Sequence, residues 1–190
     1  MAMGLLGEGI NEIIATTRKN AAPIGIIYRN EKYSAVLFHG SHTEENVLRD
    51  GWLVANIVYD PVLYVETAFG DLPESAFCEE VVQGKTVDRL CEAEAWVLFE
   101  CRLERNTGEA SVVSLMPVKE EVISAVVRPF NRGFAAVIDA TVHATRYVVN
   151  RDPALYQMIQ YNFRIIKKCG NAKEQEALFI LNEIVKKVDS

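Results

Sequence analysis

Hydrophobic and polar residues alternate with a period of two through much of the first two thirds of the chain. Runs of this kind, rich in Val, Ile, Tyr and Phe and bounded by turn residues, are typical of half-buried β-strands. The pattern predicts strands over residues 9–17, 24–28, 33–38, 52–58, 96–103 and 110–115. Asn106, Thr107 and Gly108 are predicted to turn the last two into a long hairpin, and a further short strand is predicted near residues 122–127.

Two segments of this region give a weaker signal. Residues 62–69 fit either a strand or a helix, and Gly70 to Pro73 break whichever forms. Residues 73–88 show no pattern that assigns them, so the sequence predicts only a connection there.

Apolar residues recur at every third or fourth position in the last third of the chain, which predicts three amphipathic helices. Asn131 is a candidate N-cap for the first, Asp152 before Pro153 begins the second, and Asn171 with Glu174 resembles a capping box for the third. We therefore expect a fold that is mainly β with α. A β domain over residues 1–128 precedes a helical appendage over residues 129–190, which packs on that domain or on a second subunit.

Charge and composition narrow the classes of function. The chain has 190 residues and a formal net charge of -6, which gives no electrostatic reason to expect a nucleic-acid partner. No stretch is apolar enough to cross a membrane and no signal peptide is evident, so we expect a cytoplasmic protein without membrane association. The cysteines lack metal-ligand spacing, which predicts reduced thiols and no metal site.

Residues 38–56 carry the clearest candidate chemistry. A strand delivers Gly40, Ser41, His42 and Thr43 to a short helix, for which Thr43 is a candidate N-cap. Free backbone N–H groups and hydroxyls at a helix N-terminus can receive a phosphate. The alternative is an ordinary β-turn followed by a capped helix.

This stretch resembles the FMN-binding split barrels, a superfamily that includes flavin reductases and pyridoxamine-phosphate oxidases. The resemblance rests on Gly-Ser-x-Thr-x-x-Asn at residues 40–46 and on the Val-Ala-Asn-Ile strand at residues 54–57. Upstream, residues 16–25 resemble the paired first strands of that barrel. Downstream, residues 131–140 and 143–146 resemble one uncharacterised, mainly archaeal family within the superfamily, whose members are described as FMN-binding. Where the oxidase branch has Ser-Arg-Lys, this chain has Ser41-His42-Thr43, which is closer to the flavin reductases and gives no basis for pyridoxamine-phosphate oxidation.

The resemblance implies a six-stranded split β-barrel with a C-terminal three-helix appendage, an FMN cofactor and a homodimer. The residues that it implies for cofactor binding are Thr17, Arg18, Asn20, Ala21, Ala22, Pro23, Gly40, Ser41, His42, Thr43, Asn46, Asn56, His143 and Arg146. Arg18 fits either a turn surface or a phosphate clamp. His143 and Arg146 fit either a flavin contact or a polar helix face on which Asp139 pairs with His143.

The implied function is that of a flavin-dependent oxidoreductase or flavin reductase, in which a small-molecule donor reduces the flavin and the flavin reduces a small acceptor. The alternative is a flavin-binding module without turnover, which serves as a carrier, sensor or assembly partner. The sequence identifies no catalytic acid or base.

Overall fold

A computed structural model describes residues 4–189, which divide into two compact units. Residues up to 59 together with residues 71–126 form a barrel unit, and residues 60–70 together with residues from 127 onward form a helical unit. The predicted domains 1–128 and 129–190 differ from this division at residues 60–70. This segment is a helix, and its apolar side chains Val62 and Val65 pack with the C-terminal helices.

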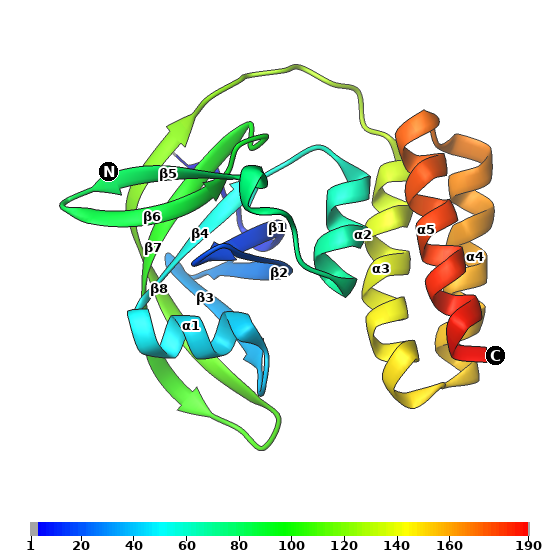
Figure 1. Cartoon of the computed structure of the whole chain (residues 1–190), viewed down its shortest axis with the longest axis horizontal. Helices are drawn as coiled ribbons and strands as arrows, with labels where there is room; N and C mark the ends of the chain where they lie inside the picture. Colours follow the sequence, from blue (N-terminus) through cyan, green and yellow to red (C-terminus); the bar gives the residue numbers. More distant parts are fainter. Residues whose placement is uncertain (1–3, 190) are drawn as a thin grey trace. The chain divides into compact units, whose positions relative to one another are not determined.

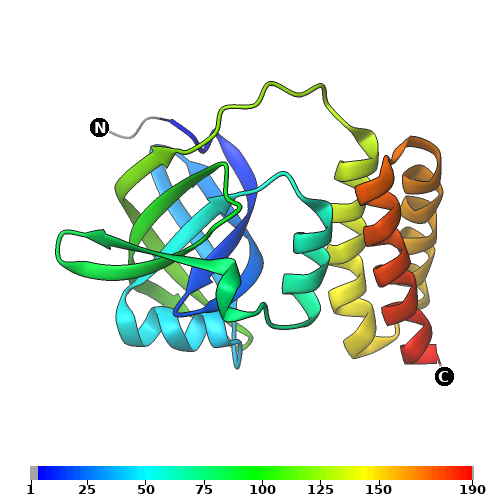
Figure 2. The same ribbon diagram turned by 45° about the horizontal axis from the view of Figure 1, so that its top comes forward.

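Six antiparallel strands close the barrel in the order β1-β2-β3-β8-β7-β4 (Figures 1 and 2). They are β1 (Gly9–Thr17), β2 (Asn20–Arg29), β3 (Lys32–Phe38), β4 (Trp52–Ile57), β7 (Ala95–Asn106) and β8 (Ala110–Val122). The predicted split barrel is therefore confirmed. The separate strand predicted near residues 122–127 is wrong, because β8 itself runs to Val122 and the chain then leaves the sheet.

The barrel interior follows from the period-two pattern, since alternate residues of each strand point inward, among them Ile13, Leu53 and Phe99. The opposite face of β4 and β7 is buried as well. Trp52 and Trp96 lie there with Val82 and Val87, which belong to a separate hairpin. This hairpin, β5 (Phe77–Val82) and β6 (Lys85–Leu90), follows the short 3₁₀ helix η1 (Glu74–Ala76) and accounts for the segment that the sequence left unassigned.

A disulfide joins Cys78 to Cys91 at the open end of the β5–β6 hairpin, with the Cα atoms 5.0 Å apart. The prediction of reduced thiols is wrong for this pair, because the hairpin register that brings the two residues together was not visible in the sequence. Cys101 and Cys169 are free. Burial raises the pKa of the Cys101 thiol to about 12, so this side chain serves as part of the barrel core.

Helix α1 (His42–Asp50) connects β3 to β4 within the barrel unit. It ends at Gly51, which has a left-handed φ of 71° and donates its backbone N–H to Val47 O at 2.9 Å. A left-handed C-terminal residue is where glycine is favoured. The buried Val47 packs into the barrel core and so fixes the helix on the barrel.

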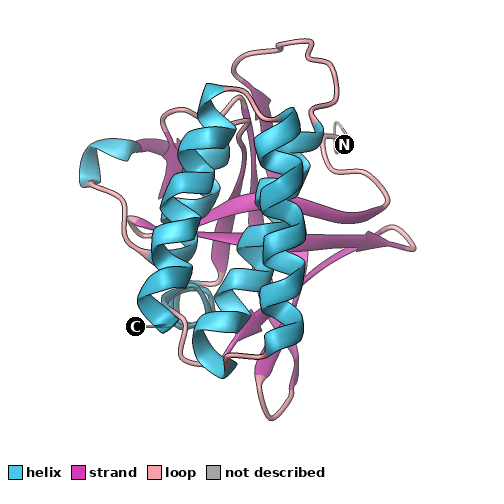
Figure 3. Cartoon of the chain, turned by 90° about the vertical axis from the view of Figure 1, so that its right-hand side faces the viewer, coloured by secondary structure: helices cyan, strands magenta, loops and turns pink. Residues whose placement is uncertain are grey.

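The helical unit contains α2 (Pro61–Phe69), α3 (Arg132–Asn150), α4 (Pro153–Cys169) and α5 (Ala172–Asp189), shown in Figure 3. The three predicted C-terminal helices are confirmed, with Asn131 and Asp152 as N-caps. At the start of α5, the Asn171 N–H donates to Glu174 Oε2 at 2.7 Å, and Asn171 Oδ1 accepts the Lys173 N–H at 2.8 Å. Of the residues described, no helix combines the length and the apolar character that a membrane span requires.

Gly133 occupies the closest approach between α3 and the end of α4. A Cβ atom added to Gly133 would lie 2.6 Å from the Cα of Gly170, a distance at which backbone must shift. Gly133 therefore serves packing, because backbone fills the space that a side chain would need.

Candidate functional site

The N-terminal end of α1 is built differently from the sequence prediction. Ser41, not Thr43, is the N-cap, and its Oγ accepts the Glu44 N–H at 3.2 Å while its hydroxyl donates to Phe38 O at 2.8 Å. The helix begins at His42, which places Thr43 within the first turn, where its side chain is buried. The Ser41 hydroxyl is therefore already engaged in bonds within the protein.

Glu44 supplies an internal anion at this helix end. The residue is only 5% exposed, and its Oε2 accepts the Gly40 N–H at 3.1 Å while its Oε1 accepts the Ser111 hydroxyl at 2.6 Å. The pKa of Glu44 is lowered mainly by the Ser111 hydrogen bond, with further contributions from His39 and Gly40. An ionised carboxylate thus occupies part of the place where a phosphate was predicted.

His39 bridges Glu44 to the β7–β8 hairpin loop. Its Nδ1 lies 2.6 Å from Glu44 Oε1 and its Nε2 lies 2.9 Å from the backbone oxygen of Thr107. Both partners are acceptors, so both ring nitrogens can donate only in the imidazolium form. The pKa of His39 is accordingly raised, first by the bond to Thr107 and then by the bond to Glu44.

Four of the predicted site residues converge between β1, β2 and α1. Asn20 Nδ2 donates to Thr43 Oγ1 at 3.1 Å and lies 3.5 Å from Thr17 Oγ1. Asn46 Nδ2 donates to the backbone oxygen and to Oγ1 of Thr17, at 3.0 and 3.2 Å. Beside them, β2 carries the predicted residues Ala21, Ala22 and Pro23, of which Ala21 is buried.

Asn56 has a different environment from these residues. It is fully buried, and its Nδ2 donates to Ile14 O at 2.9 Å and to Thr16 Oγ1 at 3.0 Å, while its Oδ1 accepts the Leu90 N–H at 2.8 Å. The side chain therefore links β1, β4 and β6. These bonds explain why a polar residue can lie in a strand that is buried on both faces.

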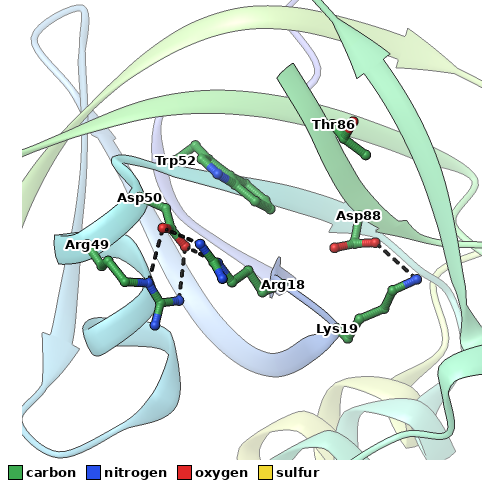
Figure 4. A pocket seen from close by; sticks show the side chains of 7 residues that line it. All are labelled: Arg18, Lys19, Arg49, Asp50, Trp52, Thr86 and Asp88. Atoms are coloured by element: carbon green, nitrogen blue, oxygen red, sulfur yellow. Dashed lines mark hydrogen bonds and ion pairs between the residues drawn. The ribbon is translucent and has the colours of Figure 1, made fainter. Parts of the chain in front are cut away.

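A cavity of about 640 Å³ lies next to this polar cluster in the barrel unit (Figure 4). Three cations, two carboxylates, a hydroxyl and an indole ring line it: Arg18, Lys19, Arg49, Asp50, Asp88, Thr86 and Trp52. A hydrogen bond links the cluster to the cavity lining, since Arg49 Nη2 donates to Asn46 Oδ1.

Asp50 organises one side of the cavity. Arg18 donates from Nε and Nη2 to the two Asp50 oxygens, at 2.5 and 2.9 Å, and Arg49 donates from its own Nε and Nη2 at 3.1 and 3.0 Å (Figure 4). These contacts, Arg49 first and Arg18 second, lower the pKa of Asp50 to about 2. The carboxylate is thus charged at any ordinary pH and holds both guanidinium groups in place.

Lys19 closes the opposite side. Its Nζ lies 3.3 Å from Asp88 Oδ1 and 3.3 Å from Glu79 Oε1, so it joins the β1–β2 turn to the β5–β6 hairpin. Of the residues around this cavity, the sequence had identified only Arg18. Arg49 and Asp50 lie in the last turn of α1, whereas the sequence signal for a ligand lay at the start of that helix. Thr86 and Asp88 lie in the segment that could not be assigned.

His143 and Arg146 lie on α3 and belong to the helical unit, where the predicted i, i+4 contact is present: His143 Nε2 is 3.5 Å from Asp139 Oδ1. Asn162 Nδ2 on α4 donates to the same carboxylate at 2.6 Å. A role of His143 or Arg146 in flavin binding stays a prediction. Among the residues described here, no group of three His, Cys, Asp or Glu side chains could hold a metal ion.

Comparison with known proteins places the chain in a family. The N-terminal domain model of a family of proteins of unknown function, DUF447, matches residues 11–124, and the companion model of that family matches residues 131–183. The chain belongs to the DUF447 family. This confirms the family that the sequence blocks resemble.

Two relatives of this DUF447 protein are informative. The uncharacterized protein MJ1453 of Methanocaldococcus jannaschii is 26% identical over 198 residues, which cover 90% of this chain and 96% of MJ1453. The crystal structure of the FMN-bound protein MM1853 from Methanosarcina mazei is 42% identical, with a TM-score of 0.86 over 94% of this chain and 96% of that one. The similarity to MM1853 therefore spans both units of the chain.

Proposed function

We propose that this DUF447 protein binds FMN and acts as a flavin-dependent oxidoreductase on small molecules. The observation that carries the proposal is the FMN-bound state of MM1853, which is 42% identical over 94% of this chain. When bound, the flavin supplies the redox chemistry, and the protein supplies binding and orientation.

The residues of the barrel unit fit an FMN molecule in chemical type. FMN needs hydrogen-bond partners for a flat polar ring and cations for a phosphate. The half-buried amides of Asn20 and Asn46 supply the first, and the buried hydroxyls of Thr17 and Thr43 hold these amides in place. The adjoining cavity with Arg18 and Arg49 supplies the second. An aromatic wall at Trp52 gives the cavity an apolar component.

Titration of FMN into the flavin-free full-length protein tests this function. We expect one FMN bound per chain, quenching of the tryptophan fluorescence, and the near-UV and blue absorption bands of oxidised flavin after gel filtration. Turnover is tested separately, by oxidation of NADH or NADPH with free FMN as acceptor. Binding without turnover would favour a flavin carrier or sensor, and absence of flavin binding would refute the proposal.

We also propose a homodimer. Apolar side chains on neighbouring barrel strands are exposed to solvent, including Phe38 at 63%, Leu103 at 51% and Met116 at 53%. Exposed apolar side chains of this size are frequent in protein–protein interfaces. Sedimentation equilibrium of a dimer gives twice the chain mass of 21.3 kDa, whereas a monomer at micromolar concentration would refute it. The predicted cytoplasmic location stays a prediction.

A further inference from the structure

We infer that the cavity between the β1–β2 turn, the end of α1 and β6 is a phosphate-binding site, with Arg18 and Arg49 as its ligands and Asp50 as the residue that positions them. The phosphate is that of FMN or that of a nicotinamide dinucleotide donor. The choice of these two ligands rests on the proposed function. Binding of a phosphate by the arginines does not depend on that function and can be tested without a flavin.

The arginines have donors left for an anion. Each guanidinium uses Nε and Nη2 on Asp50, and no hydrogen bond within residues 4–189 involves Nη1 of either one. The side chains are 58% and 52% exposed, so these remaining N–H groups are accessible to a ligand. Arginine forks are well suited to the oxygens of a phosphate, and a fork that is already oriented loses less freedom on binding.

The cavity is less unfavourable to an anion than the chain as a whole. Arg18, Lys19 and Arg49 contribute three positive charges to the cavity lining, and Asp50 and Asp88 contribute two negative charges. Glu79, 3.3 Å from Lys19, balances the third positive charge, whereas the chain as a whole has a net charge of -6. A locally balanced site with exposed guanidinium groups repels an anion less than the rest of an acidic surface does.

The backbone of the β1–β2 turn supports a binding role for its side chains. Arg18 and Lys19 have positive φ angles of 49° and 54°, a region that two-residue hairpin turns usually fill with Asn or Gly. The β2–β3 turn has Asn30 before Glu31, and the β5–β6 turn has Gly84 after Gln83. The β1–β2 turn has neither Asn nor Gly. Two long cations therefore occupy positions that disfavour them, and both line the cavity.

Two variants and a matched control test the site. Arg49→Gln removes one fork, and the double variant Arg18→Asn, Lys19→Gly removes the turn cations while it installs the preferred turn residues. Arg29→Gln is the control, because Arg29 is exposed and lies at the other end of β2 from the turn. Each full-length protein is titrated with FMN, riboflavin, NADPH and inorganic pyrophosphate at matched ionic strength, and its thermal unfolding is recorded without ligand.

We expect the double variant to stay folded, because the preferred turn residues offset part of the ion pairs that it removes, while its affinity for a phosphate ligand falls. Loss of one charge-assisted contact corresponds to roughly ten- to a hundredfold weaker binding. If FMN weakens and riboflavin does not, the phosphate is that of the flavin. If both flavins bind as before but NADPH and pyrophosphate weaken, it is that of the dinucleotide.

Unchanged binding of every phosphate ligand by both variants would overturn the inference, even if wild type binds FMN and the proposed function survives. Conversely, a wild type that binds pyrophosphate through these arginines but binds no flavin would support the site and refute the flavin function. Equal losses in Arg29→Gln would show that only overall charge matters, which also overturns the inference.

Discussion

The two ends of helix α1 differ in how they relate to anion binding. The sequence signal for a phosphate lies at the N-terminal end, whereas the site that we infer from the structure lies at the C-terminal end. The N-terminal end has the macrodipole polarity that favours an anion, by about 0.3–1 kcal/mol, and it was the predicted phosphate site. The protein has placed its own carboxylate, Glu44, on the Gly40 N–H there. The C-terminal end has the opposite polarity but carries Arg49 and, through Asp50, Arg18.

The magnitudes favour the C-terminal end. Hydrogen bonds to charged groups contribute about 1.5–3 kcal/mol each, so the N–H groups that Arg18 and Arg49 keep beside their bonds to Asp50 outweigh an unfavourable dipole of at most about 1 kcal/mol. A helix N-terminus therefore binds a ligand anion only when the protein has not filled it with an anion of its own.

The largest effect that we predict concerns this internal anion. Glu44→Ala removes the acceptor for the Gly40 N–H, the Ser111 hydroxyl and the His39 ring, and of these three the Ser111 hydroxyl is fully buried. We expect the free energy of unfolding to fall by about 3 kcal/mol, measured by urea titration. Glu45→Ala is the matched control, since Glu45 is the exposed neighbour in the same turn and should cost less than about 0.5 kcal/mol. Equal losses in the two variants would contradict this account.

Glu44→Gln tests at which end of α1 the phosphate of FMN binds. It removes the negative charge at the N-terminal end and leaves the size of the side chain unchanged. If the phosphate binds at Arg18 and Arg49, FMN affinity in the folded protein should change by less than about threefold, a difference below roughly 0.7 kcal/mol. A tenfold gain in FMN affinity without a gain in riboflavin affinity would place the phosphate at the N-terminal end instead.

Asp50→Asn tests the other end of the helix. The pKa of Asp50 is lowered from 3.8 to about 2, so its charged form contributes stability above pH 3.8 that is lost as the pH falls toward 2. The full shift corresponds to about 2.5 kcal/mol, but the arginine partners are more than half exposed, so we expect about 1 kcal/mol at neutral pH. Unfolding free energies of wild type and variant, measured from pH 6 to pH 2, should converge at the acid end. A constant difference would refute this role.

Local periodicity predicted the strands and the three C-terminal helices, and the resemblance to the split barrels implied that the strands close into a barrel. Strands such as residues 9–17 and caps such as Asn131 are determined by neighbours in the chain. The prediction of Thr43 as the N-cap of α1 is wrong, because Ser41 and Thr43 are both residue types that favour this position. The buried position of Thr43 decides between them.

The cavity could not be predicted for a different reason. It combines residues 18–19, 49–52 and 86–88, which meet only after the barrel has closed and the β5–β6 hairpin has packed on its outer face. The one local signal is that Arg18 and Lys19 occupy turn positions with positive φ. This can be recognised only when the two-residue turn between β1 and β2 is known.

The smallest predicted effect is a pH dependence of the melting temperature that comes from His39, at the N-terminal end of α1. Its pKa is raised above 6.5 because Thr107 O and Glu44 both accept from the ring. A raised pKa in the folded state means that this stability is fully present below pH 6.5 and is lost as the pH rises through the folded pKa. The melting temperature of wild type should therefore decline above pH 6.5, and His39→Gln should reduce that slope. His42→Gln, at the exposed neighbouring histidine, should keep the slope of wild type. An NMR titration of the His39 ring gives the pKa directly, and a value at or below 6.5 would show that the imidazolium does not join α1 to the β7–β8 loop.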